Sequence, residues 1–288
     1  MSKFKFHKFW YLVGLLLLAN TAVVFATRQS RPRDHTTVNF FDVGQGDATY
    51  LRTPRGSDIL VDAGPGDVLL GKLGAAMPFF DRTIELAILT HPHADHITGM
   101  IEVLKRYNVR KVILPEADYD SQTYRVFLDL LSGKHVAIVR PKLGERIFLD
   151  NETVLDIDYP VLGGAENHPS DINDVSIVAR LSFGQSNVLL MGDAGKDIEQ
   201  TLLAYHLPLD AEILKVGHHG SRHSTSVELL KDVNPRYGVI SVGAKNTYGH
   251  PHEETLQALA SSGVEILRTD ERGDVAFALY PDRVELQK

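Results

Sequence analysis

Four side chains that commonly bind metal ions fall within six residues of this chain, directly after a predicted buried strand. They are His91, His93, Asp95 and His96. Imidazole and carboxylate groups are ligands for zinc, manganese and iron alike. In an extended turn, His91 and His93 can face one point, and Asp95 and His96 can turn toward a second point nearby. This spacing suits two metal ions, one holding the substrate while the other activates water.

A solvent-exposed, histidine-rich loop is the alternative interpretation of this segment, but its place after an apolar strand favours an ordered site. The chain contains no cysteine, so disulfides, thiolate zinc sites and cysteine nucleophiles are excluded. Its formal net charge of −7 argues against tight, non-specific DNA binding, because proteins that neutralise phosphates are usually basic. The charge says less about an enzyme whose bound metals supply positive charge.

The segment from His91 to His96 matches the HxHxDH signature of the metallo-β-lactamase superfamily. Six further motifs, in the expected order, resemble the hydrolase domain of the ComEC-type competence proteins. They are FDVGQGDA at 41–48, VDAG at 61–64, NDVS at 173–176, MGD at 191–193, LKVGHHGS at 214–221 and YGHP at 248–251. The resemblance implies an α/β (α+β) fold, the four-layer αββα metallo-β-lactamase sandwich.

Metal-binding roles are implied by this resemblance. It assigns His91 and His93 to a first ion, Asp95 and His96 to a second, Asp193 to a bridge between them, and one of His218 or His219 to the second ion. The implied cofactor is two divalent transition metal ions, zinc or manganese.

Catalytic and positioning roles are implied in the same way. Asp95 or Asp193 would help to orient the attacking hydroxide. Related esterases suggest His219 as the ligand and His218 as a proton donor or phosphate contact, but the sequence alone leaves the order of this pair open. Asp62 would orient a ligand or the loop. An ordinary turn aspartate is the alternative for Asp62.

One position departs from the superfamily pattern. Many members supply another histidine to the first metal from the middle of the chain, where this chain has Asn173 and Asp174. His168 lies five residues before Asn173 and is not assigned as a ligand. The first metal site is therefore expected to be weaker, or filled only when substrate is bound. Asp174 or Asn173 could also approach it.

Two loops carry candidate substrate contacts. Ser221, His223 and Ser224 follow the histidine pair and could contact phosphate oxygens; residues of an ordinary surface loop are the alternative. Tyr248, His250 and His252 lie in a loop with glycine and proline that could overhang the site.

Short strands interrupted by helices in both halves of the chain predict two packed sheets with helices outside. Strands are expected at 38–43, 48–52, 58–62, 85–90, 109–114, 147–150, 153–158, 175–182, 187–191, 211–216, 237–241, 264–268 and 274–280. Helices are expected at 101–107, 121–132, 196–204, 226–232 and 253–261. Residues 269–273 are predicted to form a hairpin turn. Nothing within 37–288 has the composition of an interdomain linker, so one hydrolase domain is expected there.

Residues 1–26 have the composition of an export signal. Three lysines at 3–8 precede an apolar run of about 18 residues, which is near the lower limit for spanning a bilayer. A cleaved signal peptide and an uncleaved single membrane anchor both fit this pattern. A buried core helix would not explain the basic residues on both sides. Residues 27–36 are predicted to be a polar linker, and the domain is expected outside the cytoplasmic membrane, either secreted or anchored.

Together these features predict an exported metal-dependent hydrolase. A phosphodiester is the expected substrate, single-stranded DNA in particular, because the domain that the chain resembles is implicated in degrading one strand of incoming DNA. One amino-terminal segment cannot form a DNA pore, so a role in uptake would need a membrane channel partner. An esterase that acts on a phosphorylcholine ester or a lactone is the second hypothesis. A non-catalytic envelope binding module is the third.

Overall fold

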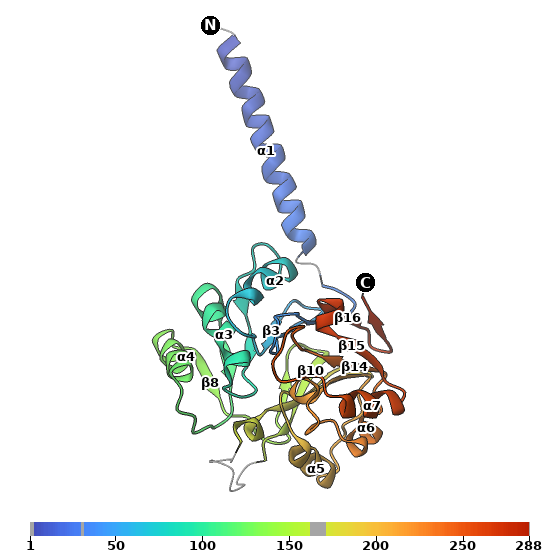
Figure 1. Cartoon of the computed structure of the whole chain (residues 1–288). Coiled ribbons are helices and arrows are strands. Elements are labelled where there is room, and N and C mark those ends of the chain that lie inside the picture. Colours follow the sequence, from blue (N-terminus) through green and yellow to red (C-terminus); the bar gives the residue numbers. More distant parts are fainter. Residues whose placement is uncertain (1–2, 30–31, 162–170, 288) are drawn as a thin grey trace.

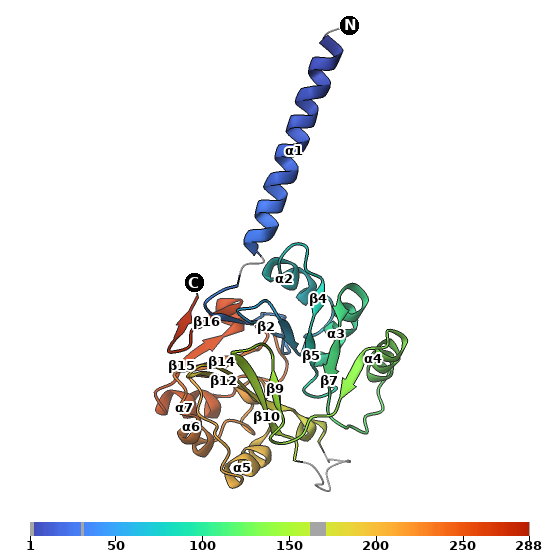
Figure 2. The same cartoon turned by 180° about the vertical axis from the view of Figure 1, so that it is seen from behind.

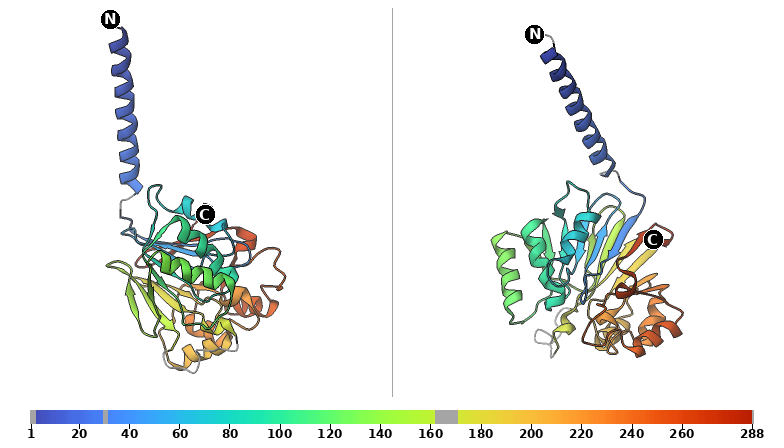
Figure 3. Two further views of the ribbon diagram at one scale, coloured as in Figure 1. Left: turned by 90° about the vertical axis from the view of Figure 1, so that its left-hand side faces the viewer. Right: turned by 45° about the horizontal axis from the view of Figure 1, so that its top comes forward.

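Two β-sheets packed face to face form the centre of the molecule, and helices cover the outer face of each (Figures 1 and 3). The computed structural model describes residues 3–29, 32–161 and 171–287. Buried apolar side chains of both sheets, such as Phe40, Leu155 and Phe277, fill the space between the sheets. Separate apolar clusters join each sheet to its own helices. The predicted four-layer αββα sandwich is therefore confirmed.

The first sheet has eight strands in the order β17-β16-β1-β2-β3-β5-β7-β8. Their bounds are β1 Thr36–Phe40, β2 Thr49–Arg52, β3 Asp58–Val61, β5 Leu86–Ile88, β7 Lys111–Ile113, β8 Ala137–Val139, β16 Val275–Leu279 and β17 Val284–Leu286. A small parallel pair, β4 (Thr83–Ile84) and β6 (Asn108–Val109), accompanies it. Helices α2 (Val68–Ala76), α3 (Ala94–Arg106) and α4 (Gln122–Gly133) cover its outer face (Figure 2).

The second sheet has seven strands in the order β15-β14-β13-β12-β11-β10-β9. Their bounds are β9 Arg146–Phe148, β10 Thr153–Tyr159, β11 Val178–Phe183, β12 Ser186–Leu190, β13 Ile213–Lys215, β14 Tyr237–Ile240 and β15 Glu265–Arg268. Helices α5 (Lys196–Ala204), α6 (Val227–Val233) and α7 (Glu253–Ser261) cover its outer face. Two short 3₁₀ turns, η1 (Ile172–Val175) and η2 (Gly217–Gly220), lie in its connections.

Burial of the strands explains their sequence patterns. In β10, Leu155 and Ile157 face the core between the sheets, while Asp156 between them pairs with Arg146 at 2.7 Å. Strands between the opposite sheet and the helices are buried on both faces. Every residue of β12 is buried, so its apolar residues, Val188, Leu189 and Leu190, follow one another directly instead of alternating with polar residues.

The parallel strands of each sheet determine where a site can form. Strands β3 and β5 run parallel in the first sheet, and β12, β13 and β14 run parallel in the second. Loops that follow parallel strands gather at one edge of a sheet, which is where ligands bind in many α/β folds. The loops after all five strands carry residues that the sequence analysis selected or that contact them.

The structure corrects two predicted elements near this edge. Helix α3 begins at Ala94 rather than 101, so Asp95 and His96 lie in a first helical turn and not in an extended turn. Residues 269–273 form no hairpin. Helix α8 (Thr269–Arg272) connects β15 of the second sheet to β16 of the first, and strands in different sheets cannot form a hairpin.

The sequence analysis also missed α2, β8 and β17. Two glycines, Gly71 and Gly74, weaken the helical signal of α2, because glycine is a poor helix former. Strands β8 and β17 have only three residues each, too few for a recognisable alternation.

The amino-terminal segment forms α1 (Lys3–Gln29), which projects away from the sandwich (Figure 1). Many apolar side chains along it, including Trp10, Leu15 and Leu18, are exposed. The predicted linker 27–36 is shorter than expected, because α1 continues to Gln29 and β1 begins at Thr36. In the parts of the chain that the structure describes, no helix has both the length and the hydropathy for crossing a membrane.

Close packing of α3 on the turn after β3 positions the helix and generates a prediction. The Gly99 N–H donates to the Gly64 carbonyl at 2.8 Å, and a Cβ at Gly99 would overlap the carbonyl oxygen of Ala63. We expect Gly99→Ala to lower the free energy of unfolding by about 1–3 kcal/mol through overpacking, although alanine favours helices. Chemical denaturation measures this change.

The matched control is Gly71→Ala in α2, where a Cβ would have no neighbour within 4 Å. That variant should gain about 0.5–1 kcal/mol from helix propensity. Equal stabilities for the two variants would contradict the packing argument.

Candidate metal centre

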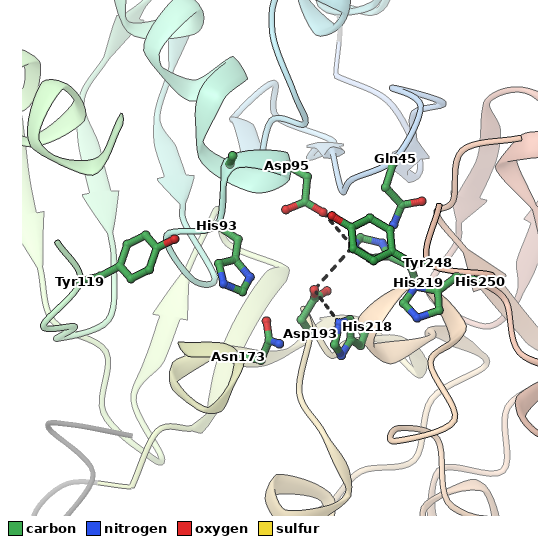
Figure 4. A pocket seen from close by; sticks show the side chains of 11 residues that line it. Gln45, His93, Asp95, Tyr119, Asn173, Asp193, His218, His219, Tyr248 and His250 are labelled. Carbon is green, nitrogen blue, oxygen red and sulfur yellow. Dashed lines mark ion pairs between the residues drawn. The ribbon is translucent and has the colours of Figure 1, made fainter. Parts of the chain in front are cut away.

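A pocket of about 400 Å³ opens at the edge where the parallel strands end (Figure 4). Many of the predicted site residues line it: His93, Asp95, Asp193, His218, His219, Tyr248 and His250. Gln45, Tyr119 and Asn173 complete much of the remaining wall. Residues from both halves of the chain therefore meet in one place.

The Asp193 carboxylate lies at the centre of this edge, in the loop after β12. It is 2% exposed, and its backbone N–H donates to Ser176 Oγ at 3.2 Å. Four imidazole Nε2 atoms surround its Oδ2: His96 and His219 at 3.5 Å, His91 at 3.7 Å and His218 at 3.9 Å. A carboxylate with this surrounding occupies the position from which it could bridge two ions.

Four sets of side chains among the described residues bring their ligand atoms within 4.8 Å of one another. Two of them contain Asp47: Asp47, Asp193 and His219, and Asp47, Asp62 and His96. The other two are a first set of His91, His96 and Asp193 and a second set of Asp95, His96 and His219. His93 lines the pocket, with its Nδ1 3.1 Å from His91 Nε2, but it belongs to none of these sets. The second set brings together three of the residues predicted for the second ion. The first set differs from the prediction because His96 takes the place of His93.

Orphaned polar atoms test whether this cluster suits a metal ion. His96 Nε2, His219 Nε2 and Asp193 Oδ1 are buried and have no hydrogen-bond partner within the described residues. Such a group costs about 1–3 kcal/mol when it stays unsatisfied. Nitrogen and carboxylate oxygen atoms are the ligands that zinc and manganese take. The cluster therefore fits divalent metal ions.

His96 is held in a ligand orientation by Asp62, which follows β3. The Asp62 Oδ2 atom lies 2.9 Å from His96 Nδ1, and its carboxylate also accepts hydrogen bonds from the Thr90 N–H at 2.8 Å and hydroxyl at 2.6 Å. With a proton on Nδ1, His96 presents Nε2 to the centre. Asp62 itself adopts a left-handed φ of 54°, a strained conformation for aspartate. The structure thus places Asp62 where it can orient a ligand.

The two histidines of η2 have different positions. Both have left-handed backbones, with φ of 47° at His218 and 52° at His219. His219 is buried, its Nδ1 lies 2.9 Å from the Ser241 carbonyl oxygen, and its Nε2 lies 3.3 Å from Asp95 Oδ2. The side chain of His218 is 28% exposed and faces the pocket. These contacts favour His219 as the ligand and His218 as a group that meets the substrate.

Electrostatics within the cluster favour positive charge at its centre. Burial lowers the pKa of His219, but Asp193 and Asp47 outweigh it and raise this pKa to about 10. Asp193 and Asp62 likewise overcome burial and hold the pKa of His96 well above its usual value. A bound cation supplies this positive charge while its imidazole ligands stay neutral.

At the pocket rim, the surroundings favour neutral rather than positively charged histidines. Burial lowers the pKa of His218, and burial together with the neighbouring imidazoles lowers that of His250 to about 4. The rim histidines are therefore neutral at physiological pH and can donate or accept a hydrogen bond.

The structure places the remaining predicted residues unevenly. Tyr248, 65% exposed, stacks on His250 with ring centroids 5.8 Å apart. Ser221 is not brought to the pocket: it is buried, and its Oγ accepts a hydrogen bond from the His223 N–H at 3.3 Å. Its expected role as a substrate contact therefore stays a prediction that the geometry of the two pockets does not support. His168 lies outside the described residues.

Asn173, the position at which the sequence departs from the pattern of the resembled superfamily, has a buried Oδ1 with no hydrogen-bond partner among the described residues. A second pocket of about 540 Å³ shares Asn173, Asp193 and His218 with the first. Asp174, Lys196 and His223 are among the residues that line this second pocket. The candidate centre is therefore open on two sides.

Four residues that were not predicted as site residues from the sequence lie at the site in the structure. Gln45 and Asp47 belong to the FDVGQGDA motif and Lys215 to LKVGHHGS, but the motifs alone gave them no partner. Tyr119 belongs to no motif, and its ring lies 5.9 Å from that of His93. Long-range contacts, which the sequence does not specify, determine these positions.

The two histidines of η2 can be separated by measuring metal binding. We expect His219→Asn to weaken Zn²⁺ affinity by more than the roughly 10- to 100-fold typical of losing an outer partner, because a direct ligand is lost. His218→Asn should keep most of the metal. Asparagine is chosen because it tolerates the left-handed backbone. Elemental analysis and chelator competition measure both, and the reverse order would exchange the two roles.

Comparisons with known proteins agree with this geometry. A family model described as the metallo-beta-lactamase superfamily matches residues 41–244. ComE operon protein 3 of Bacillus subtilis (strain 168) is 30% identical over 266 residues, covering 86% of this chain and 33% of that protein. Recombination protein 2 of Haemophilus influenzae is 30% identical over 285 residues, covering 96% and 32%. Competence protein ComA of Neisseria gonorrhoeae is 28% identical over 281 residues, covering 96% and 36%.

The chain spans about a third of the length of these curated relatives. Among solved structures, YhfI from Bacillus subtilis superimposes with a TM-score of 0.58 at 13% identity, covering 85% of this chain and 100% of that one. CmlA from Streptomyces venezuelae, a diiron β-hydroxylase, superimposes with a TM-score of 0.56 at 16% identity, covering 86% and 55%. At such low identity these likenesses show the fold alone.

Proposed function

Because the chain belongs to the metallo-β-lactamase superfamily, we propose that it is a metal-dependent hydrolase that cleaves phosphodiester bonds, with single-stranded DNA as its substrate. The observation that carries the proposal is the convergence of four imidazoles on the buried Asp193 carboxylate. Such a cluster can hold two divalent ions, zinc or manganese. When bound, these ions would supply a water nucleophile at neutral pH and stabilise developing negative charge.

The chain's own residues would prepare this reaction. Asp62 and the Ser241 carbonyl hold His96 and His219 with Nε2 directed at the centre. Asp95 and Asp193 would orient the attacking hydroxide. The His218 ring at the rim, close to Asp193, would hydrogen-bond a phosphoryl or leaving-group oxygen. Holding these groups in place before substrate arrives lowers the reorganisation that the reaction needs.

Two features support a nucleic acid strand as the substrate. The centre opens into pockets on two sides, which suits the interior of a chain. Tyr119 and Tyr248 lie on opposite sides of the centre (Figure 4), where their rings could stack on bases. The names of the relatives, which refer to competence and recombination, agree with DNA processing. A role in uptake would require a membrane channel partner.

One observation favours a second candidate, an esterase that acts on a small exported ester. Besides Asp193, the second pocket is lined by three carboxylates, Asp171, Asp174 and Asp197, against one lysine, Lys196. This balance repels a run of phosphates but suits a cationic group such as that of a phosphorylcholine ester. A non-catalytic envelope binding module is disfavoured because Asp95, His96, Asp193 and His219 still converge at one point.

A side-by-side assay separates these candidates. We expect Mn²⁺- or Zn²⁺-loaded protein to hydrolyse a single-stranded DNA oligonucleotide and bis-p-nitrophenyl phosphate, with p-nitrophenyl phosphorylcholine and a lactone much poorer. Asp193→Ala serves as the inactive control. The esterase hypothesis would replace ours if only the small esters were cleaved.

Within this assay, Tyr248→Ala should raise the KM for the oligonucleotide about 5- to 100-fold, because one base stack contributes about 1–3 kcal/mol. Tyr205→Ala is the matched control, since Tyr205 is also exposed but lines neither pocket. The same KM for both variants would remove Tyr248 from the binding surface.

We also propose that the hydrolase domain works outside the cytoplasmic membrane. The basic residues before the apolar part of α1 support this, as a signal peptide or an anchor. A reporter that is active only outside the cytoplasm, fused after residue 36, should be active. A fusion that lacks residues 1–26 should be inactive and is the control. An equally silent reporter on both fusions would refute export.

A further inference from the structure

We infer that Lys215 and Asp47 form a buried ion pair that positions His219 and ties the two halves of the metal centre together. This inference rests on the proposed metal-dependent function. Lys215 ends β13 and is 2% exposed, while Asp47, in the loop before β2, is 3% exposed. The Lys215 Nζ lies 2.8 Å from Asp47 Oδ2 and also donates to the Val216 carbonyl at 2.8 Å.

Stability alone does not explain a buried pair of this kind. Removing two charges from water costs several kcal/mol per ion, and well-packed apolar residues often stabilise such a position equally well or better. The two preceding residues of β13, Ile213 and Leu214, are buried and apolar, so an apolar side chain would suit its environment. A lysine at this position therefore points to a role in the geometry of the site.

The contact between Asp47 and His219 defines that role. Asp47 Oδ1 lies 3.3 Å from His219 Nδ1, an atom that the Ser241 carbonyl also approaches at 2.9 Å. Lys215 holds the other carboxylate oxygen, which fixes the rotation of the carboxylate toward the imidazole. His219 Nε2 is thereby left facing Asp95 and Asp193.

The same loop also contacts the other half of the centre. The Asp47 N–H donates to the Asp95 carbonyl at 3.3 Å. Gly46 has a φ of 139°, and a Cβ there would collide with the same carbonyl, so the loop packs directly on the first turn of α3. Asp47 therefore contacts both Asp95 of the first sheet's helix and His219 of the second sheet. The Lys215–Asp47 pair joins these two ligands of one metal set.

Asp62 provides an instructive comparison. Its Oδ2 hydrogen-bonds His96 Nδ1 at 2.9 Å, whereas Asp47 Oδ1 makes a charge contact with His219 Nδ1 at 3.3 Å and has no hydrogen-bond partner among the described residues. The Asp62 carboxylate is fixed by the Thr90 N–H and hydroxyl, all on loops of the first sheet. Asp47 must instead reach across from the first sheet to a histidine of the second. Lys215, the last residue of β13 in the second sheet, therefore fixes Asp47 from the same sheet that carries His219.

Metal affinity distinguishes positioning from simple stabilisation. The test variant is Asp47→Leu/Lys215→Met, which replaces both charges by apolar groups and leaves no unpaired buried charge. The matched control is Arg52→Met/Asp58→Leu, which removes a second buried pair, with Arg52 Nη1 and Asp58 Oδ1 2.6 Å apart, at the opposite end of β2 and β3. Each full-length protein is titrated with Zn²⁺ by chelator competition at a temperature where circular dichroism shows it folded.

We expect Zn²⁺ affinity to fall roughly 10- to 100-fold in the test variant, as for other groups that orient metal ligands. The control should stay within about twofold of the unaltered protein, because distant sites act independently. The Asp47→Asn variant, which keeps an oxygen acceptor, should lose less Zn²⁺ affinity than the variant with Asp47→Leu. Equal affinity in the test variant and the unaltered protein would overturn the inference and leave the proposed function intact. An unaltered protein that binds no Zn²⁺ would overturn the proposed function itself.

Discussion

Four imidazole rings point their Nε2 atoms at one buried carboxylate, an arrangement that suits a bound cation. Much of the surrounding structure serves to keep these five side chains together. Asp193 lies within 3.9 Å of an Nε2 atom from each of His91, His96, His218 and His219. Without a partner, buried imidazole nitrogens and carboxylate oxygens would be lost hydrogen-bonding groups. The two sheets must therefore hold their loops in register at one edge, because residues that follow strands of both sheets contribute to the same centre.

The need to hold loops of both sheets at one edge accounts for three positions at which the backbone is strained. Asp62, His218 and His219 all have left-handed φ values, which cost a non-glycine residue about 1–2 kcal/mol each. All three lie in loops that follow parallel strands, at the edge where the centre forms. The layers behind them have buried apolar cores, and the stability of this packing offsets the free-energy cost of the strained residues. The other four described non-glycine residues with left-handed φ, His135, His206, Thr225 and Asn234, line neither pocket, so three of seven such residues lie at the centre.

The sequence predicted the local features of this site well and its long-range contacts poorly. The four layers followed from strand and helix patterns together with the family motifs. The spacing of His91, His93, Asp95 and His96 indicated a metal cluster, but Pro92 and the polar residues hid the start of α3, so the turn was predicted as extended. His96 falls in one set with His91 and Asp193, although motif order assigned His91 and His96 to different ions. The partnership of Asp47 with His219 joins positions 172 residues apart, and no periodicity reports such a contact.

The fold restricts the chemistry of the centre less than its pockets do. CmlA shares this fold and is a diiron β-hydroxylase, so the sandwich alone does not select hydrolysis of a particular ester. Selection must come from groups that meet the substrate, and these differ on the two sides of Asp193. On one side lie His218, His250 and the tyrosines Tyr119 and Tyr248, whose rings suit flat groups. On the other side carboxylates outnumber the lysine, which suits a positive or uncharged group. A strand of the proposed DNA substrate would therefore place its bases against the tyrosines on one side, while the carboxylates on the other side would repel its phosphates and weaken the binding of that part.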